Sequence, residues 1–218
     1  MTSSVDAAVA RAQMVELQLR RRGIRDERVL GAMARVPRDR FVPDSLSGHA
    51  YDDGALPIGN DQTISQPFVV ATICALLGLQ GSERVLDVGT GSGYQAAVLA
   101  ELAAEVVTIE RIPELAERAR ATLADVGYGN VEVMVGDGSL GAPERAPFDA
   151  IAVAAAAPMI PPALFDQLAE GGRLVIPRGS RFGQDLVLVA RTPDGPTERT
   201  SIPCRFVPLV GDEGFGEN

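Results

Sequence analysis

Apolar residues between positions 66 and 177 recur in two kinds of segment. Short, nearly continuous apolar runs, which are typical of buried parallel strands, alternate with longer segments of helical spacing. Alternation at this spacing indicates parallel βαβ units with right-handed crossovers. The pattern predicts strands at 84–88, 105–110, 131–135, 148–154 and 172–177, and helices at 66–78, 93–103, 113–126 and 161–169.

Two more apolar runs follow, at 185–191 and at about 201–207. No helix fits between them, so we expect these two strands to pair antiparallel. The predicted fold is an α/β, doubly wound, mostly parallel seven-stranded sheet with an antiparallel end strand. Residues 1–218 are predicted to form a single domain, in which 1–64 are an N-terminal helical extension with a long loop and 65–218 are the α/β core.

The N-terminal part of the chain has a different pattern. Residues 8–22 have helical spacing and stop at Gly23, and Asp26 is placed to cap a second helix at about 27–35. Residues 37–63 are predicted to be irregular, because prolines and glycines interrupt them repeatedly. A loop of this length in a compact domain is usually functional, or it is evidence that an element has been misread.

Charge and composition exclude several classes of function. The net charge of −9 argues against a general nucleic-acid-binding protein, although residues 1–40 carry nine Arg against five acidic residues. The absence of Lys excludes Schiff-base chemistry, and the single histidine, His49, cannot build a histidine metal site. Cys74 and Cys204 match no metal-ligand spacing, so no metal is expected. With no leader pattern and no apolar run near about 18 residues, we expect a cytoplasmic protein.

A glycine-rich turn, Gly89-Thr90-Gly91-Ser92-Gly93, joins the strand at 84–88 to the next helix, and we call it the glycine loop. Ligands of doubly wound sheets bind beyond the carboxyl ends of the strands, and glycines let the backbone approach them closely. Glu110 ends the next strand and is placed to accept hydrogen bonds from ribose hydroxyls. Asp137, between two glycines after the third strand, is placed to accept from an adenine amino group. Together these residues indicate a nucleoside ligand.

Two features of the sequence discriminate between NAD and S-adenosylmethionine, the two nucleoside ligands that fit this arrangement. The glycine loop lacks the last glycine of a dinucleotide-binding GxGxxG motif, because Tyr94 stands there. Asp87, two residues before the loop, would repel a pyrophosphate but suits a ligand with a cationic amino-acid end. Both features favour S-adenosylmethionine over NAD.

The chain resembles the class I methyltransferases, which have a Rossmann-like fold, and within them the protein-L-isoaspartate (D-aspartate) O-methyltransferase family. The resemblance covers about residues 14 to 211, and its "TIS" segment is far more specific to the family than the glycine loop. Two departures are mild, since Asp87 stands where relatives often have Glu and Phe215 where they often have Trp. The matching stretches are "RVPRDRFVP", "YDDGALPIGNDQTISQP", "VLDVGTGSGYQAAVLAEL", "VGDGSLG", "APFDAIAVAAAAPMIPPALFDQL", "GGRLVIPRG" and "FVPLVG".

The resemblance implies a protein repair enzyme. The family transfers a methyl group from S-adenosylmethionine to the free α-carboxylate of L-isoaspartyl residues, with D-aspartyl residues as a second candidate acceptor, and leaves S-adenosylhomocysteine. The methyl ester closes to a succinimide, which hydrolyses partly to normal aspartate. The expected partners are isoaspartyl-containing proteins and peptides, with no nucleic acid, no membrane and a monomeric state.

The resemblance also implies roles for individual residues. Ser65 of "TIS" corresponds to the family's active-site residue, which makes the long loop before it an active-site loop. Peptide contacts are expected from Tyr51, Asp52, Gln167 and Val207, with a loop anchor as the alternative for Tyr51 and a helix-surface residue for Gln167. Donor contacts are expected from Thr63, Ile64, Ser65, Asp87, Gly89, Thr90, Gly91, Ser92, Gly93, Glu110, Arg111, Asp137 and Gly138.

The chemistry suits a chain with few catalytic side chains. A carboxylate acceptor, with a pKa near ~4, is ionised at neutral pH and needs no general base. Orientation of such an anion against a sulfonium methyl group can lower the barrier by roughly 7–11 kcal/mol. We hypothesise that Ser65 donates a hydrogen bond that orients one carboxylate oxygen and is not a nucleophile. Ser65 is also placed to cap the helix that begins at Pro67.

Other functions stay open from the sequence. The same fold could serve a small-molecule or RNA acceptor, although the acidic net charge opposes RNA. A non-catalytic module that binds the donor and regulates a partner is a second alternative. An NAD-dependent oxidoreductase is a third, and the missing third glycine opposes it.

Overall fold

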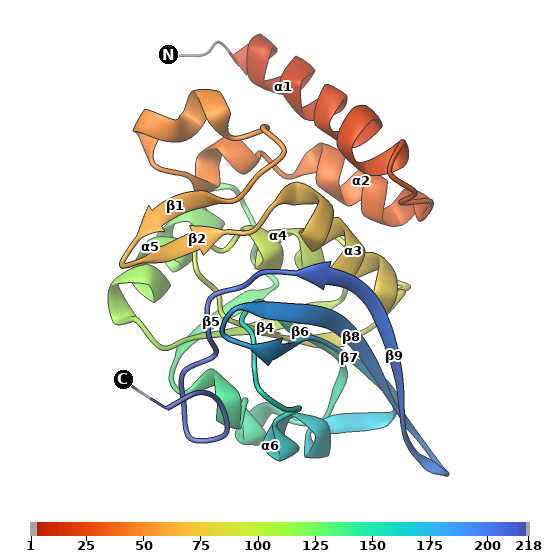
Figure 1. The fold of residues 1–218 in the computed structure, drawn as a ribbon. Coiled ribbons are helices and arrows are strands. Elements are labelled where there is room, and N and C mark those ends of the chain that lie inside the picture. The colour runs from red at the N-terminus through yellow and green to blue at the C-terminus, as the bar shows by residue number, and fades with distance from the viewer. Residues whose placement is uncertain (1–3, 217–218) are drawn as a thin grey trace.

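The computed structural model describes residues 4–216, and its centre is a seven-stranded sheet in the order β5-β4-β3-β6-β7-β8-β9 (Figure 1). Neighbours from β5 to β7 in this order pair parallel, as predicted. Residues 1–3 and 217–218 of the predicted single domain lie outside the described residues. The strands are β3 (Arg84–Val88), β4 (Glu105–Glu110), β5 (Val131–Val135), β6 (Phe148–Val153), β7 (Leu168–Ser180), β8 (Gly183–Thr192) and β9 (Gly195–Cys204).

Helices cover both faces of the sheet, so the predicted doubly wound architecture is confirmed. Successive strand residues point to opposite faces, and Val85 therefore joins one hydrophobic core while Leu86 joins the other. Two buried faces explain why the strands read as continuous apolar runs in the sequence. The first face carries α3 (Pro67–Leu77), α4 (Tyr94–Ala100) and α5 (Pro113–Asp125), and the second carries α6 (Pro162–Asp166).

The last three strands form the antiparallel end of the sheet. β8 pairs antiparallel with both β7 and β9, which confirms the predicted pairing of the final strands. The predicted bounds of the last strand, 201–207, are wrong, because β9 runs over Gly195–Cys204. The first half of β9 is polar and lies at the exposed sheet edge, so it has no apolar run. The predicted helix at 161–169 also ends early, because the chain enters β7 at Leu168.

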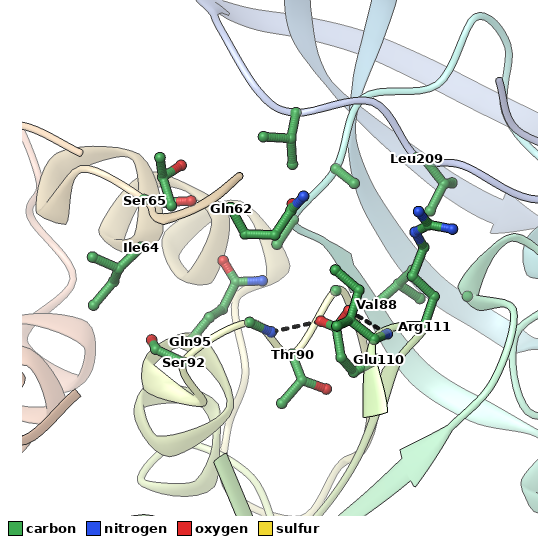
Figure 2. A pocket seen from close by; sticks show the side chains of 18 of the residues that line it. Gln62, Ile64, Ser65, Val88, Thr90, Ser92, Gln95, Glu110, Arg111 and Leu209 are labelled. Atoms are coloured by element: carbon green, nitrogen blue, oxygen red, sulfur yellow. Dashed lines mark hydrogen bonds between the residues drawn. The ribbon is translucent and has the colours of Figure 1, made fainter. Parts of the chain in front are cut away.

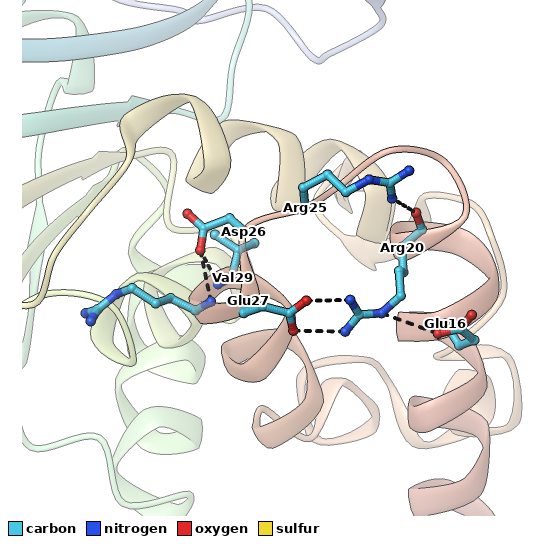
Figure 3. Close-up of polar contacts among 7 residues, drawn as sticks. Glu16, Arg20, Arg25, Asp26, Glu27 and Val29 are labelled. Atoms are coloured by element: carbon cyan, nitrogen blue, oxygen red, sulfur yellow. Dashed lines mark hydrogen bonds and ion pairs between the residues drawn. The ribbon is translucent and has the colours of Figure 1, made fainter.

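The N-terminal helices form a further layer, packed against α3 and α4 (Figure 1). The predicted cap is confirmed, since Asp26 accepts hydrogen bonds from two backbone N–H groups of the next helix, at 2.9 and 3.3 Å. Arg20 forms an ion pair with Glu27 across the turn between the helices, and another with Glu16 one turn earlier on its own helical segment (Figure 3). These elements are α1 (Ser4–Gln13), which starts before the predicted residue 8, the π-helical segment η1 (Met14–Arg20), and α2 (Glu27–Arg35).

Residues 37–63 contain more regular structure than the irregular loop predicted. The turn residues Asn60 and Asp61 of a short hairpin have φ values of 52° and 56°, which Asn and Asp tolerate better than most residues. Strands of four and three residues are too short to show alternation in the sequence, so the hairpin escapes prediction. The segment contains two 3₁₀ helices, η2 (Arg38–Phe41) and η3 (Asp44–His49), and the antiparallel strands β1 (Leu56–Gly59) and β2 (Gln62–Ile64).

A buried cation fastens this segment to the core. The guanidinium of Arg38 is fully buried, and its Nε donates to the carbonyl oxygen of Ala50 at 2.7 Å. The guanidinium carbon lies 4.8 Å from the ring centroid of Tyr94, an attractive cation–π distance. Because Tyr94 is the first residue of α4, the segment before β1 is held against the helix that the glycine loop opens.

The predicted cap of α3 by Ser65 is wrong. The N-cap residue is Gln66, with no side-chain cap bond, and Pro67 is the first residue of the helix. Gln66 has the extended backbone that a following proline requires, so Ser65 stands one residue too far from the helix to cap it. Within the part of the chain that the structure describes, the Ser65 hydroxyl makes no hydrogen bond, and it is therefore free to meet a ligand.

Candidate active site

A cleft of about 900 Å³, partly open to solvent, lies at the carboxyl ends of β3, β4 and β6, and we call it the central cleft. Its walls include the glycine loop, the end of β4 with Arg111 and Ile112, residues 62–65 from β2 onward, and residues 207–210 (Figure 2). A volume of this size suits a nucleoside with an amino-acid end. The cleft is at the edge of the sheet where doubly wound folds bind ligands.

Glu110 and the glycine loop support each other. The Glu110 side chain is only 6% exposed, and its Oε2 accepts from the Gly91 N–H at 2.9 Å while its Oε1 accepts from the Ile112 N–H at 3.0 Å (Figure 2). Gly91 has a φ of 53°, in the left-handed region that glycine adopts without strain. Each carboxylate oxygen still has acceptor capacity for a ligand hydroxyl. The residue predicted to bind a ribose therefore also fixes the loop beside it.

Asp87 lies behind the glycine loop and does not line the central cleft. Its carboxylate is fully buried and accepts from Gln95 Nε2 at 2.8 Å and from Thr108 Oγ1 at 2.7 Å. The Thr108 hydroxyl is also 2.7 Å from the hydroxyl of Thr90 in the loop. Burial raises the pKa of Asp87 to about 6, against the opposite effect of the two hydrogen bonds. Any influence of Asp87 on a ligand therefore passes through Gln95 and through its electric field.

Asp137 also lies outside the central cleft. Its Oδ1 accepts from the backbone N–H and hydroxyl of Ser139, at 2.8 and 2.7 Å, and its Oδ2 accepts from the Asp212 N–H at 2.8 Å. Burial opposes ionisation of this carboxyl, but the hydrogen bonds outweigh burial and lower its pKa. The side chain thus ties the C-terminal segment to the end of β5, while its neighbour Gly138 lines the cleft. The predicted adenine contact of Asp137 has no support from this placement.

The other predicted donor residues gather around the central cleft, with one exception. Gly93 is the N-cap residue of α4, with a φ of 89°, and packs against Leu123 of α5 instead of the cleft. The predicted residues that do line the cleft are Thr63, Ile64, Ser65, Gly89, Thr90, Gly91, Ser92, Glu110, Arg111 and Gly138.

A second cleft, of about 790 Å³, meets the central cleft, and we call it the side cleft. Thr63, Ser65, Ala154 and Val207 line both clefts, so the two clefts adjoin at these residues. The rest of the side cleft is lined by residues 53–55, by Gln66 and Val69, and by residues 203–206. Ser65, whose hydroxyl has no partner among the described residues, thus lies at the junction of two ligand-sized spaces.

Two of the predicted peptide-binding residues differ in their placement. Val207 lines both clefts, next to the junction. Tyr51 lines neither cleft, and its phenol donates a hydrogen bond to Asp39. Burial, together with the neighbouring Asp39 carboxylate, raises the pKa of the Tyr51 hydroxyl. Tyr51 is an anchor of the loop before β1.

The other two predicted peptide-binding residues lie away from both clefts. Asp52 is exposed and its carboxylate lies 2.9 Å from Nδ1 of His49. Gln167 is buried, where its Oε1 accepts from the Ala142 N–H and its Nε2 donates to the Leu140 carbonyl, both at 2.8 Å. Gln167 holds the loop before β6, lines neither cleft, and is not an exposed helix residue.

The sequence predictions omit several cleft residues, among them Gln95 in the central cleft and Asp53 and Arg205 in the side cleft. Gln95 had a signal in the sequence, because it is a polar residue in the otherwise apolar turn "YQAAVLA". Asp53 and Arg205 are charged residues of loops, whose approach to Ser65 depends on tertiary structure. Among residues 4–216, no group of three or more His, Cys, Asp and Glu side chains could hold a metal ion.

A family model and curated relatives agree on one family for this chain. A model of the family described as protein-L-isoaspartate (D-aspartate) O-methyltransferase matches residues 10–214. Protein-L-isoaspartate O-methyltransferase 1 of Syntrophobacter fumaroxidans is 57% identical over 94% of this chain and 96% of its own length. Protein-L-isoaspartate O-methyltransferase 2 of Marinobacter nauticus is 56% identical over 96% and 97% of the two chains.

Solved structures agree with the sequence relatives. A protein-L-isoaspartate O-methyltransferase superimposes with a TM-score of 0.83 at 29% identity, over 93% of this chain and 67% of the other. A Plasmodium falciparum structure, described as a putative enzyme of the same name in complex with S-adenosyl-L-homocysteine, gives a TM-score of 0.80 at 26% identity over 92% and 98% of the two chains. With the family model and relatives above half identity over nearly the whole length, the chain belongs to the protein-L-isoaspartate (D-aspartate) O-methyltransferase family.

Proposed function

We propose that the chain methylates the free α-carboxylate of L-isoaspartyl residues in proteins and peptides, with S-adenosylmethionine as the donor. The observation that carries this proposal is the position of Ser65 where the central and side clefts meet. Two substrates that enter by different clefts would have their reacting groups together beside this hydroxyl. Family membership confirms the predicted reaction class and methyl donor.

The central cleft fits the donor on features of this structure. Glu110 retains acceptor capacity for ribose hydroxyls, and the glycine loop has no side chains at positions 89 and 91 to block a close approach. Gly138 leaves room for a flat ring next to Arg111. Residues 207–210 close the opposite wall. Bound there, the donor supplies a methyl group on a sulfonium cation.

The side cleft fits the acceptor. An isoaspartyl residue carries its reacting carboxylate on a short branch of the peptide chain, and the junction at Ser65 is reached from the side cleft. The carboxylate is ionised at neutral pH, so an oxygen lone pair can attack the methyl carbon without a general base. The carbon–sulfur bond then breaks and its electrons neutralise the sulfonium.

Ser65 suits the orientation of this carboxylate. A neutral hydroxyl that donates to one oxygen fixes the direction of attack but leaves the charge of the second oxygen available. A bidentate Arg contact would bind the carboxylate more tightly and weaken it as a nucleophile. Ile64 and Val207 beside the junction are apolar and would help to exclude water from the reacting groups.

We further propose that the chain acts as a cytoplasmic monomer, with damaged proteins as its partners and with no nucleic acid or membrane involved. The net charge of −9 supports the absence of nucleic acid. No helix among residues 4–216 is long and apolar enough to cross a membrane.

A methyl-transfer assay tests the function. Two synthetic peptides that differ only in an isoaspartyl or an aspartyl linkage are incubated with the chain and labelled donor. We expect a base-labile methyl ester on the isoaspartyl peptide alone. Equal labelling of both peptides, or labelling of only a small molecule or RNA, would contradict the proposed acceptor. Donor binding without transfer to any carboxylate would instead indicate a regulatory binding module.

Replacement of the junction hydroxyl tests its role. Ser65→Ala should lower kcat by roughly 100-fold or more, because a transition-state hydrogen bond is lost, while the affinity for S-adenosylhomocysteine stays within about twofold. Steady-state kinetics and calorimetric titration measure the two effects. Ser45→Ala is the matched control, since Ser45 is an exposed serine outside both clefts. Full turnover in Ser65→Ala would remove Ser65 from the mechanism.

The raised pKa of Asp87 predicts a pH dependence of donor binding. Its carboxylate is ionised above pH about 6 and protonated below, and the ionised form favours a cationic ligand. The affinity for S-adenosylhomocysteine, which keeps an ammonium group, should therefore fall as pH decreases through 6, by as much as about tenfold per pH unit. Calorimetry between about pH 5 and 8 measures it.

Two variants accompany this titration. Asp87→Asn should bind the ligand more weakly at neutral pH and lose the dependence, whereas Asp194→Asn, at an exposed turn residue, should keep it. If the affinity of Asp87→Asn for S-adenosylhomocysteine changed with pH as steeply as that of the unmodified chain, the titrating group would be another residue.

A further inference from the structure

Gln95 is a polar residue of the central cleft for which neither the sequence nor the family comparison gives a role. It lies in the first turn of α4, directly after the glycine loop, and its residue is 6% exposed. Its side chain rises from α4 toward the space between Ser65 and Glu110 (Figure 2).

The orientation of the Gln95 amide is fixed by its neighbour. Nε2 donates to Asp87 Oδ1 at 2.8 Å, and an ionised carboxylate can only accept. The amide oxygen must therefore point away from Asp87. Oε1 is buried, and no described residue donates a hydrogen bond to it. A buried acceptor without a donor is unfavourable, so this oxygen favours a ligand that brings an N–H or O–H group.

The charge behind Gln95 selects the kind of donor group. The Asp87 carboxylate polarises the amide through the hydrogen bond, which makes Oε1 more negative. Asp87 itself is shielded from the cleft by the glycine loop and Gln95. A cationic N–H group is the donor that gains most from this arrangement.

We propose that Gln95 Oε1 accepts a hydrogen bond from the α-ammonium group of S-adenosylmethionine. This inference rests on the proposed function, which places the donor in the central cleft. In that placement the donor's ribose hydroxyls would face Glu110 and its adenine would lie toward Gly138, which follows β5 on the far side of β4 from β3 and Gln95. Gln95 thereby relays the charge of the buried Asp87 to the amino-acid end of the donor and sets the position of its methyl group relative to Ser65.

Two ligands, one with the ammonium group and one without it, distinguish this contact from a purely structural role of Gln95. S-adenosylhomocysteine carries the ammonium group, whereas 5′-methylthioadenosine has the same nucleoside and a thioether but no amino-acid end. Gln95→Met keeps the shape of the side chain and removes the acceptor. Calorimetric titration of the full chain should show S-adenosylhomocysteine bound roughly 10- to 100-fold more weakly, and 5′-methylthioadenosine within about twofold of its original affinity.

Controls make each outcome decisive. Gln80→Met, at an exposed glutamine outside the clefts, should leave both affinities unchanged. Gln95→Leu repeats the comparison if the methionine variant does not fold. Equal loss of both ligands would show that Gln95 only supports the glycine loop, and an unchanged affinity for S-adenosylhomocysteine would show no contact, so either result overturns the inference. Failure of the unmodified chain to bind either ligand would overturn the donor site itself and the inference with it.

Discussion

The candidate active site depends on one buried carboxylate that joins three elements. Asp87 of β3 is paired in register with Thr108 of β4 and accepts hydrogen bonds from Thr108 and from Gln95 of α4. A buried carboxylate without such donors would be strongly unfavourable, so the two strands and the helix must keep their relative positions. The glycine loop spans the short connection between β3 and α4, and Thr90 joins the same network. This network therefore fixes the backbone of the glycine loop from the side that faces away from the central cleft.

The N-terminal segment supplies the other half of the site. Arg38 fastens the region before the hairpin to Tyr94 of α4, and the hairpin then brings Thr63 and Ser65 to the glycine loop. The proline after Gln66 starts α3 without a side-chain cap, which leaves the Ser65 hydroxyl unused by the helix. A serine that would be an ordinary cap one residue later is therefore available at the junction of the two clefts.

The accuracy of the sequence predictions follows burial. The central strands could be predicted because both faces are covered, whereas the polar edge strand β9 and the short hairpin carry no such signal. Glu110 could be placed at the central cleft because the end of a parallel strand fixes its position. The roles of Asp137 and Gln167 could not, because contacts with segments distant in the sequence decide them. Gln95 needed the structure, since only its hydrogen bond to Asp87 reveals the unpartnered oxygen.

In the proposed reaction the donor and the isoaspartyl carboxylate meet at Ser65. A crystal structure of the chain with S-adenosylhomocysteine and an isoaspartyl peptide tests this meeting point most directly. We expect S-adenosylhomocysteine in the central cleft, the peptide in the side cleft, and one oxygen of the free α-carboxylate within about 3 Å of Ser65 Oγ. A carboxylate bound elsewhere, or a Ser65 hydroxyl turned to the backbone of α3 with the peptide in place, would contradict it.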